Sequence, residues 1–509
     1  MGAELMTGNT DRANPVTVCN TWISQLLQGF AVIEPDYDRL VGALELSSQR
    51  VERGDVFVAL PGITVDGRHY IEHAIANRAS AIIFEKSGSH REDQVVGGIP
   101  LIGVENLKSK LGIIAARLYS NPSRALNVIG VTGTNGKTTI AFMIAQALDA
   151  CGQKCGYSGT VGSGFIGNLE KSEFTTADAI SVQHQLAGFV ADSARALAME
   201  VSSHGLDQGR ANGVEFKTGV FTNLTQDHLD YHQSMEKYAA AKQKLFEFAS
   251  LENAVINVDD EFGSTLEKLC RLPERNIKCF TYGINSGELR PENLEISDQG
   301  FSFDLTLQGK VVKIESDFLG EVNVYNLLAT IAVLDSAGVS ADKIVSVIPL
   351  IGPPPGRMEV FGNVAHQPAV VVDFAHTPDA LERTLVSLRK LCRGKLVVVF
   401  GCGGDRDKGK RPQMGLIAET LGDQVFITDD NPRTECPAQI IEDIRAGMSG
   451  PATVVHDRRE AVRQAIALCS GDDMVLVAGK GHEDTQSIMG QDFALSDRIF
   501  VPQLLESEK

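Results

Sequence analysis

Short runs of apolar residues alternate with helical patterns along nearly the whole chain. Runs such as AVVVDF, LVVVF and MVLVA are apolar at almost every position, which is typical of strands buried on both faces of a parallel sheet. The helical stretches between such runs would supply the crossover connections. This pattern predicts an α/β protein built on mostly parallel sheets.

The predicted strands form three groups separated by two interruptions. Helix-stopping residues at Tyr119–Asn127 mark the first interruption, and three consecutive prolines within Ile348–Gly362 exclude regular structure at the second. A length of 509 residues also favours about three domains. We therefore predict a small α/β domain over residues 1–123, a central domain over 124–350 and a Rossmann-like C-terminal domain over 351–509. The predicted strands lie at residues 55–60, 79–85 and 99–104, with a helix over 69–77, then at 126–133, 194–201, 218–224 and 253–259, and finally at 368–376, 395–401, 423–430 and 473–481.

Composition and charge narrow the class of protein. A hydrophobic content of 43% allows each domain a core, and a net charge of -18 argues against nucleic acid or an anionic membrane as a partner. No segment is apolar for long enough to span a bilayer, and the first residues lack the pattern of a signal peptide. Nine cysteines without a C-x-x-C pair are typical of free thiols in the cytosol.

A glycine-rich segment follows the first strand of the central domain. NVIGVTGTNGKTT (Asn127–Thr139) is a strand, a loop and a helix start, so backbone N–H groups and the helix N-terminus can meet a polyphosphate. Lys137 can reach the outer phosphates, and the Thr138 hydroxyl can bind Mg²⁺. Val131 replaces the first glycine of the strict phosphate-loop pattern, and a glycine-rich turn with an incidental lysine is the alternative. The order of strand, loop and helix favours a nucleoside triphosphate site.

Possible metal ligands follow the next two predicted strands. Glu200 ends one strand, and Asp227, His228, Asp230 and His232 come just after the other. Carboxylates near a phosphate loop suit Mg²⁺-dependent phosphoryl transfer. A helix N-cap beside a half-buried histidine is the simpler interpretation of an Asp-His pair. Clustering behind one phosphate loop favours the metal site.

Several motifs, taken in order, resemble those of one family. They are GVTGTNGKTT, AMEVSSHGLDQGR, FTNLTQDHLDYH, YAAAKQKLF, NVYNLLA, GRMEVF, DFAHTPDALE and GCGGDRDKGKRP. They resemble the signatures of the Mur ligases, ATP-dependent amino-acid ligases of peptidoglycan synthesis, from about Leu46 to Asp497. DNPR followed by GKGHE is similar to the branch of the family that adds meso-2,6-diaminopimelate to UDP-N-acetylmuramoyl-L-alanyl-D-glutamate.

The resemblance implies roles for residues of the ATP site. Lys242 matches a lysine that the family carbamylates, although a lysine on a helix would otherwise be expected on the solvated surface. Two Mg²⁺ ions would be held by Thr138, Glu200, His228 and carbamylated Lys242, with Lys137 also catalytic. Asp373 and His376 could instead be an N-cap and its neighbour. The implied ATP-binding residues are Gly133, Thr134, Asn135, Gly136, Lys137, Thr138, Thr139, Asn326, Arg357, Asp373 and His376.

The resemblance also implies a site for the UDP-sugar. The chain departs from the family pattern at Ser47-Ser48-Gln49, where Asp-Ser-Arg is usual, and at Ala177, where proline is usual. The first departure bears on uracil recognition, and neither removes a catalytic group. The implied UDP-substrate residues are Leu46, Ser48, Ile63, Thr64, Val65, Thr175, Thr176, Ser202, Gln208 and Arg210.

The segment DDNPRTE (Asp429–Glu435) follows a predicted strand and contains the arginine of the implied amino-acid site. Diaminopimelate has a far carboxylate that lysine lacks, and the planar fork of Arg433 matches a carboxylate. The alternative is that Arg433 pairs with Asp429 or Glu435 on the surface. The implied diaminopimelate-binding residues are Arg406, Asp430, Asn431, Pro432, Arg433, Gly479 and Glu483.

The implied reaction is ligation through an acyl phosphate, in a cytoplasmic monomer. Two other interpretations stay open at this point. One is folylpolyglutamate synthase, a relative with similar phosphate chemistry, and the other is a nucleotide-binding switch or scaffold that makes no product. A folylpolyglutamate synthase would act on a different substrate, and a switch or scaffold would bind nucleotide without catalysing ligation.

Overall fold

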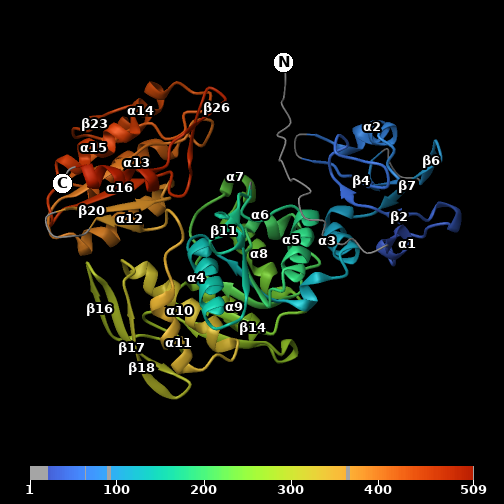
Figure 1. Cartoon of the computed structure of the whole chain (residues 1–509), viewed down its shortest axis with the longest axis horizontal. Helices are drawn as coiled ribbons and strands as arrows, with labels where there is room; N and C mark the ends of the chain where they lie inside the picture. The colour runs from blue at the N-terminus through green and yellow to red at the C-terminus, as the bar shows by residue number, and fades with distance from the viewer. Residues whose placement is uncertain (1–20, 63–64, 89–92, 173, 363–366, 508–509) are drawn as a thin grey trace. The chain divides into compact units, whose positions relative to one another are not determined.

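The computed structural model describes residues 21–62, 65–88, 93–172, 174–362 and 367–507. The chain divides into two compact units, the first ending at Thr281 and the second beginning at Tyr282. Each unit is a mixture of helices and sheets (Figure 1). None of the helices in the described ranges has the length and apolar character needed to cross a membrane.

The first sheet has five strands in the order β3-β4-β5-β7-β6. Strands β3, β4, β5 and β7 are parallel, and β6 is antiparallel at the edge. Successive residues of β4 face opposite sides of the sheet. Val56 and Val58 pack with helices α1 and α3 on one side, and Phe57 and Ala59 pack with α2 on the other. The strands predicted for this part of the chain are confirmed. The elements are β1 Thr21–Trp22, α1 Ile23–Leu26, β2 Leu40–Val41, β3 Leu44–Glu45, β4 Val56–Ala59, α2 Ile71–Ala76, β5 Ala81–Glu85, β6 Gln94–Val96, β7 Ile99–Val104 and α3 Leu107–Leu118.

The second sheet has eight strands in the order β11-β10-β9-β12-β8-β13-β14-β15. Strands β9, β12, β8, β13 and β14 are parallel, whereas β10 and β11 form antiparallel pairs at one edge. The four strands predicted here are confirmed, and β9, β10, β11 and β15 extend the sheet beyond the prediction. The elements are β8 Asn127–Thr132, α4 Lys137–Ala150, β9 Cys155–Gly159, β10 Gly162–Phe165, β11 Asn168–Glu170, α5 Ala179–Ala191, β12 Ala196–Glu200, α6 Ser203–Asp207, β13 Phe216–Phe221, α7 Leu229–His232, α8 Met235–Gln243, β14 Asn253–Asn257, α9 Glu261–Cys270 and β15 Lys278–Tyr282.

The register of this sheet brings three chain segments to one edge. Glu200 at the end of β12 pairs with Val131 of β8, and Phe221 at the end of β13 pairs with Thr132. Because parallel strands point the same way, the loops that follow β8, β12 and β13 leave the sheet side by side. The predicted phosphate loop, Glu200 and the segment before His228 therefore share one edge.

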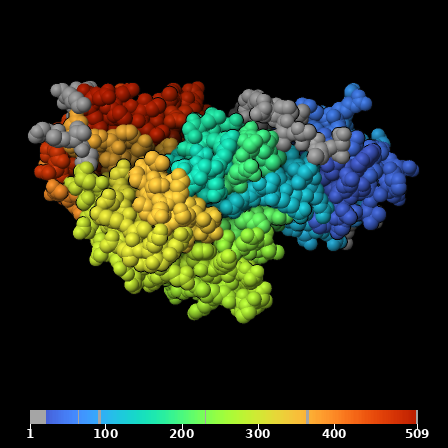
Figure 2. All heavy atoms as spheres, turned by 60° about the horizontal axis from the view of Figure 1, so that its bottom comes forward, coloured from blue at the N-terminus to red at the C-terminus, as the bar shows by residue number. Residues whose placement is uncertain are grey.

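The second unit contains a three-stranded antiparallel sheet that the sequence pattern did not predict. Helix α11 packs on β18, and Figure 1 shows the strands beside α10 and α11. The atoms of this part of the chain form one continuous yellow region in Figure 2. The elements are β16 Glu292–Ser297, β17 Gly300–Leu307, β18 Lys310–Ser316, α10 Glu321–Ser336 and α11 Ala341–Val347.

The other large sheet of this unit has six strands in the order β19-β20-β24-β21-β22-β23. Its two faces are both covered, since Val371 and Val398 pack with α12 and α13, whereas Val370 and Val397 pack with α15 and α16. The four predicted strands are confirmed as parallel neighbours. The elements are β19 Glu359–Gly362, β20 Ala369–Asp373, α12 Pro378–Leu391, β21 Leu396–Phe400, α13 Lys410–Leu421, β22 Gln424–Ile427, α14 Pro437–Arg445, β23 Thr453–Val454, α15 Arg458–Ala467, β24 Met474–Ala478, β25 Thr485–Ile488, β26 Gln491–Ala494 and α16 Asp497–Ser507.

The proline-rich segment is only partly irregular, which corrects the prediction for Ile348–Gly362. Residues 353–355 lie outside helices and strands, as expected for three prolines. Strand β19 at the end of the segment, however, pairs antiparallel with β20. Since β19 is an edge strand, the prolines before it take no hydrogen bond away from the sheet.

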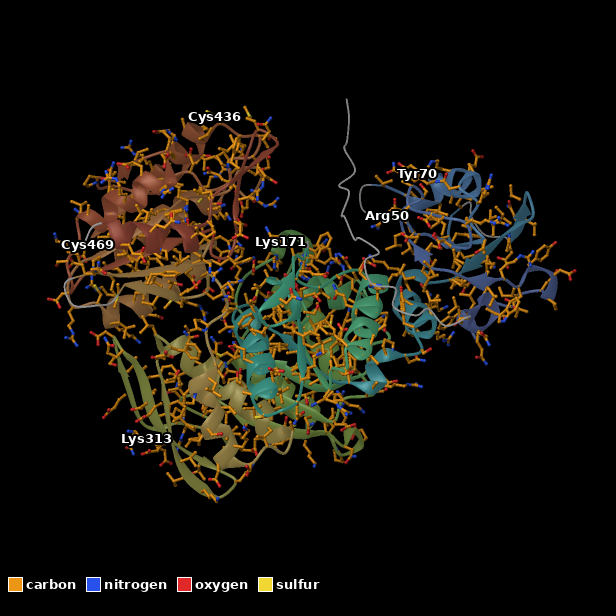
Figure 3. All side chains as sticks on the ribbon, in the orientation of Figure 1. Arg50, Tyr70, Lys171, Lys313, Cys436 and Cys469 are labelled. Carbon is orange, nitrogen blue, oxygen red and sulfur yellow. The ribbon has the colours of Figure 1, made fainter. Side chains whose placement is uncertain are left out.

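The eight cysteines in the described ranges are free thiols. Most are buried or half-buried, as expected for small apolar side chains, and Cys436 is exposed. Cys436 and Cys469 are labelled in Figure 3.

Candidate active site

The loop between β8 and α4 is shaped by Gly133. Its φ is +150°, and a Cβ there would lie 1.8 Å from Thr222 Oγ1. The segment after β13 holds the loop, since Thr134 N donates to Asn223 O (2.8 Å) and Thr222 Oγ1 donates to Asn135 O (2.6 Å). Hydrogen bonds from the segment that follows β13 therefore hold the loop in place. Helix α4 begins directly after the loop, at Lys137.

Lys137 folds back over this loop. Its ammonium donates to Gly133 O (2.9 Å) and Thr134 O (2.8 Å), so a positive charge is held above the backbone at the N-terminus of α4. An ammonium beside a helix N-terminus attracts anions. The arrangement agrees with the phosphate site that the sequence predicts.

Glu200 is completely buried at the end of β12. Its carboxylate accepts hydrogen bonds from Thr138 Oγ1 (2.9 Å), Tyr157 Oη (2.5 Å) and Thr160 N (2.8 Å). These bonds make burial of the carboxylate tolerable, because a buried polar group without partners is costly. The sequence predicted that Glu200 and Thr138 bind the same metal site. It did not predict that Tyr157 and Thr160 form hydrogen bonds with Glu200.

Residues predicted to bind the muramoyl-dipeptide surround the same strand end. Thr175 Oγ1 lies 3.0 Å from Thr160 Oγ1, and Thr176 Oγ1 donates to Glu200 O and accepts from Ser202 N, both at 3.0 Å. Arg210 Nη1 donates to Thr176 O (2.9 Å), and its Nε donates to Gln208 Oε1 (3.0 Å). The structure thus brings together Thr175, Thr176, Ser202, Gln208 and Arg210, as predicted.

Lys242 is buried, which contradicts the expectation of a solvated lysine on a helix. Only 1% of the residue is exposed, and Nζ donates to Gly133 O at 2.7 Å. The ring of Tyr238 lies below it, with its centroid 4.2 Å from Nζ. Burial, and secondly the charge of Lys137, lower the pKa of Lys242 well below 10.5. Burial therefore shifts the equilibrium of this side chain toward the neutral amine.

His228 occupies a left-handed backbone position between β13 and α7, with φ of +53°. Its Nε2 lies 3.4 Å from Asp227 Oδ2, and its ring centroid lies 4.8 Å from that of His204 and 6.2 Å from that of Tyr238. His232 is buried, with Nε2 3.0 Å from Ser203 Oγ, as in a hydrogen-bonded core histidine. The side chain of Asp230 lies outside the described part of the structure.

The predicted metal ligands have suitable chemistry at Thr138 and Glu200. Among the described residues, no group of three or more His, Cys, Asp or Glu side chains is arranged to hold a metal ion. The hydroxyl of Thr138 and the carboxylate of Glu200 are nevertheless adjacent hard oxygen donors beside a phosphate loop. Mg²⁺ usually takes one or two protein oxygens and fills its other positions with phosphate oxygens and water. The residues present fit this ion.

The predicted uridine site lies in the first sheet. Ser48 is buried, with Oγ 3.0 Å from His73 Nδ1, and its carbonyl accepts from Asn77 Nδ2 (2.8 Å). Leu46 is half-buried and Val65 is exposed. Ile63 and Thr64 lie outside the described residues.

Two residues predicted to contact the nucleotide, Asp373 and Arg357, lie at the end of β20 in the second unit. Asp373 is buried, and its carboxylate accepts from Met358 N (2.8 Å) and Ala375 N (3.0 Å). Burial raises the pKa of Asp373, and the charge of Arg357 opposes that shift. The Arg357 guanidinium lies over the Phe374 ring, 4.5 Å from its centroid.

The other two predicted nucleotide contacts of this unit are less closely linked to that carboxylate. His376 Nδ1 lies 2.8 Å from Phe374 O. Asn326 is buried in α10, where its amide donates to Asn323 Oδ1 (2.9 Å).

The residues predicted for diaminopimelate lie at the ends of three neighbouring parallel strands. Asp430, Asn431, Pro432 and Arg433 follow β22, Arg406 follows β21, and Gly479 and Glu483 follow β24. Asn431 Nδ2 donates to Glu483 Oε2 (2.7 Å), which joins two of these loops. A Cβ on Gly479 would lie 2.4 Å from Asp430 Oδ2, so the glycine permits this close approach.

Lys480 belongs to this cluster and was not predicted. Its buried ammonium donates to Asn431 Oδ1 (3.1 Å) and Glu483 Oε2 (3.1 Å). The only signal in the sequence is its place in the GKGHE motif. Glu483 therefore already has a cationic partner within the protein.

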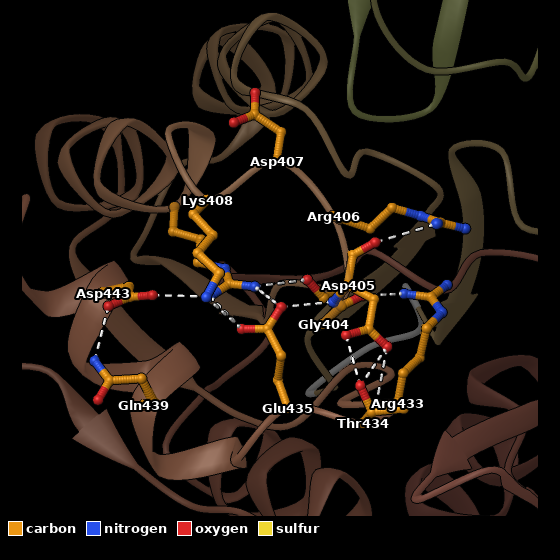
Figure 4. Close-up of polar contacts among 12 residues, drawn as sticks. Gly404, Asp405, Arg406, Asp407, Lys408, Arg433, Thr434, Glu435, Gln439 and Asp443 are labelled. Carbon is orange, nitrogen blue, oxygen red and sulfur yellow. Dashed lines mark hydrogen bonds and ion pairs between the residues drawn. The ribbon is translucent and has the colours of Figure 1, made fainter. Parts of the chain in front are cut away.

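Arg433 has no carboxylate within ion-pair distance in the part of the chain that the structure describes. Its Nη1 donates to Gly404 O at 2.8 Å (Figure 4). The two alternative partners are engaged elsewhere, since Asp429 contacts His456 (2.9 Å) and Glu435 contacts Arg411 (2.9 Å). Arg406 is exposed, and its Nη1 lies 3.3 Å from Asp405 O. The surface ion pair considered for Arg433 is thus absent from the described residues.

Comparisons with known proteins agree with this architecture. Residues 41–119 match the Mur ligase family, catalytic domain, residues 131–334 match the Mur ligase middle domain, and residues 356–481 match the Mur ligase, glutamate ligase domain. The chain belongs to the Mur ligase family.

Relatives of known name are similar over nearly the whole chain. A UDP-N-acetylmuramoyl-L-alanyl-D-glutamate–2,6-diaminopimelate ligase of Ectopseudomonas mendocina (strain ymp) is 47% identical over 466 residues, covering 90% of this chain and 94% of the relative. A solved structure of a ligase with the same name has a TM-score of 0.68 and 36% identity, covering 92% of this chain and 95% of its own. Mycobacterium tuberculosis folylpolyglutamate synthase has a TM-score of 0.60, 18% identity and coverage of 73% of this chain and 92% of its own, and it shares the fold.

Proposed function

We propose that the chain is an ATP-dependent ligase of peptidoglycan precursor synthesis. It joins an amine of meso-2,6-diaminopimelate to the γ-carboxylate of D-glutamate in UDP-N-acetylmuramoyl-L-alanyl-D-glutamate. The observation that carries the choice of amino acid is Arg433, a guanidinium at the edge of the sheet that no described carboxylate neutralises. The name of the relative that is 47% identical supports the same substrate.

The reaction proceeds through an activated carboxyl group. An oxygen of the γ-carboxylate attacks the γ-phosphorus of ATP, ADP leaves, and an acyl phosphate forms. The amine of diaminopimelate then attacks the acyl carbon, and phosphate leaves from the tetrahedral intermediate. Lys137 and the N-terminus of α4 stabilise the phosphate charge that would otherwise repel the carboxylate.

Bound Mg²⁺, with two ions expected, would supply further neutralisation of phosphate charge. Thr138 and Glu200 would hold one ion through their adjacent oxygens, and His228 and carbamylated Lys242 would contribute to the second. ATP, the UDP-sugar dipeptide and diaminopimelate are the proposed small-molecule partners. The cytoplasmic location, the monomeric state and the division at residues 123 and 350 stay predictions.

Lys242 has the environment that carbamylation needs. Its neutral amine nitrogen attacks CO₂, an N–C bond forms, and the nitrogen loses a proton to give an anionic carbamate. Burial favours the neutral amine, and the contact with Gly133 O places the new oxygens beside the phosphate loop. The neutral amine thereby becomes an anionic carbamate, whose oxygens would be ligands for Mg²⁺.

The UDP-sugar dipeptide has a matching cluster at the end of β12. Arg210 bonds only neutral acceptors among its hydrogen bonds within the described residues, the Thr176 carbonyl and the Gln208 amide. A guanidinium with neutral partners keeps its charge available for a substrate carboxylate. Thr175, Thr176 and Ser202 add hydroxyl groups next to Glu200.

One assay separates this function from its two rivals. Phosphate release should require ATP, UDP-N-acetylmuramoyl-L-alanyl-D-glutamate and diaminopimelate together, and the product should be the tripeptide. A folylpolyglutamate synthase would need a folate and glutamate instead. A nucleotide-binding switch would release no phosphate in response to either amino acid, and that result would refute the proposal.

A further inference from the structure

Arg411 is a buried arginine outside the residues predicted for the substrates. It lies in the first turn of α13, and its side chain has no exposed surface. The guanidinium donates to Glu435 (2.9 and 3.1 Å), to Asp443 Oδ2 (2.8 Å) and to Gly403 O (3.3 Å). One cation therefore joins the loop after β21, the loop after β22 and helix α14.

The two loops joined by Arg411 are the ones that contain Arg406 and Arg433. Asp405 N donates to Glu435 Oε1 (2.6 Å), and Thr434 Oγ1 donates to Asp405 Oδ1 (2.8 Å). Gly404 also contacts the other loop, because its N donates to Asn431 O (2.9 Å) and its carbonyl accepts from Arg433 Nη1. The loops form a single hydrogen-bonded body in Figure 4.

This body holds two residues in an unfavourable backbone conformation. Asp405 has φ of +53° and Arg433 has φ of +52°, both in the left-handed region. Residues other than glycine keep such angles only where surrounding contacts impose them. Glu435 is two residues from Arg433 and is the point where the buried guanidinium of Arg411 holds the loop.

We infer that Glu435, held by Arg411, is a positioning residue that sets Arg433 for the far carboxylate of the incoming diamino acid. The inference rests on the proposed function and adds a determinant of substrate specificity to it. Glu435 itself contacts no substrate in this scheme. Its carboxylate determines where the loop lies, and the loop determines where the guanidinium of Arg433 lies.

Asp443 provides a matched control for this role. It also bonds to Arg411, at 2.8 Å, but it lies on α14 and not on the loop of Arg433. Glu435→Gln and Asp443→Asn each remove one carboxylate charge from the same buried guanidinium. If Arg411 only stabilised the domain, the two variants would behave alike.

The test is steady-state kinetics of phosphate release for wild type, Glu435→Gln and Asp443→Asn, together with melting temperatures. Glu435→Gln should raise the KM for diaminopimelate by about 10- to 100-fold, since small displacements of a binding group are costly. The KM for ATP and for the UDP-substrate should stay near wild type, and the preference for diaminopimelate over L-lysine should fall. Asp443→Asn should change none of these ratios, even where its melting temperature falls equally.

Several results would overturn the inference. A normal KM for diaminopimelate in Glu435→Gln would do so, and so would equal increases in both variants. If wild type released no phosphate with diaminopimelate, the proposed function and the inference would fail together. If Glu435→Gln did not fold, Glu435→Asp would replace it, because it keeps the charge beside Arg411 and shortens the side chain by one methylene. The same rise in KM supports the inference there, and an unchanged KM contradicts it.

Discussion

At the scale of single residues, Lys242 shows how burial changes the chemistry of a common side chain. A lysine at a helix surface stays protonated and solvated, whereas Lys242 is enclosed by Gly133 and Tyr238. Its lowered pKa makes the amine available to CO₂ as pH rises through that value, and protonation removes it as pH falls. The residue is therefore suited to become an anion inside a site that binds cations.

We predict that Lys242→Ala loses ligation by at least about a hundredfold, as expected when an electrostatic contributor is removed. Short carboxylic acids should partly restore activity, because they can supply the missing oxygens. Phosphate release by Lys242→Ala without acetate measures the loss of activity, and phosphate release with added acetate measures its partial restoration. Lys237→Ala is the control, since Lys237 lies on the same helix, exposed and bonded to Gln233. Full activity of Lys242→Ala would refute the role.

The second prediction at this scale concerns Arg433. Losing a charge-assisted contact in a desolvated pocket should lower kcat/KM by about 30- to 1,000-fold. Arg433→Ala should therefore raise the KM for diaminopimelate sharply and leave the KM for ATP and the UDP-substrate near wild type. Arg433→Lys keeps the charge but loses the planar fork, so it should recover only part of the affinity. Normal use of diaminopimelate by Arg433→Ala would show that the arginine has another role.

At the scale of elements, the strands that the sequence predicts are those buried on both faces. Such strands read as unbroken apolar runs, and Val397–Phe400 of β21 is a clear example. The strands β16 and β18 were missed because their residues are mostly exposed or half-buried, so no apolar run marks them. The ends of these strands could be predicted for the same reason, and the structure places Glu200 at the end of β12 and Arg433 in the loop that follows β22.

Buried charges were the part of the site that the sequence did not reveal. Without the family resemblance Lys242 is expected on the solvated surface, and the sequence analysis did not single out Arg411 or Lys480, because charged side chains are seldom buried. Their burial depends on partners that are distant in sequence, such as Glu435 for Arg411 and Gly133 for Lys242. Such tertiary contacts cannot be predicted from the periodicity of apolar residues or from local sequence motifs.

The loop before β19 gives a prediction at the scale of elements. Gly356 has φ of +65°, and a Cβ there would lie 2.1 Å from the Gly481 carbonyl carbon. Gly356→Ala should therefore reduce the free energy of unfolding by about 2 kcal/mol or more, through backbone strain and the clash together. Gly338→Ala is a matched control, since its φ is +75° but nothing lies within 4 Å of its Cβ. Equal melting temperatures for the two variants would contradict the proposed clash.

At the scale of the whole molecule, the net charge of -18 contrasts with its proposed substrates, which are all anionic or carry carboxylates. The surface as a whole repels them, so binding must depend on local cations such as Lys137, Arg210 and Arg433. Added salt screens the long-range repulsion and the local attraction alike. Local placement of arginine and lysine therefore matters more for this chain than its overall charge.

The proposed residues for one reaction lie in both units of the chain. Lys137 and Lys242, expected at the phosphates, belong to the unit that ends at Thr281, whereas Arg357 and Arg433 belong to the unit that begins at Tyr282. The amine and the acyl phosphate must approach to about 3–3.5 Å before they react. We predict that the C-terminal part of the chain moves toward bound ATP when all substrates are present, which would exclude water from the acyl phosphate.

Small-angle scattering can test this expected closure. The radius of gyration should fall when a non-hydrolysable ATP analogue, UDP-substrate and diaminopimelate are all present, with the stiff proline-rich segment at residues 353–355 marking the border of the moving part. Each ligand alone should give a smaller change, because no single ligand contacts every part of the site. Arg433→Ala should also compact less at a diaminopimelate concentration that saturates wild type, since the contact that recruits the amino acid is lost. If the radius stayed constant with all three ligands bound, the chain would have to react in its unliganded arrangement, and closure would not be part of the mechanism.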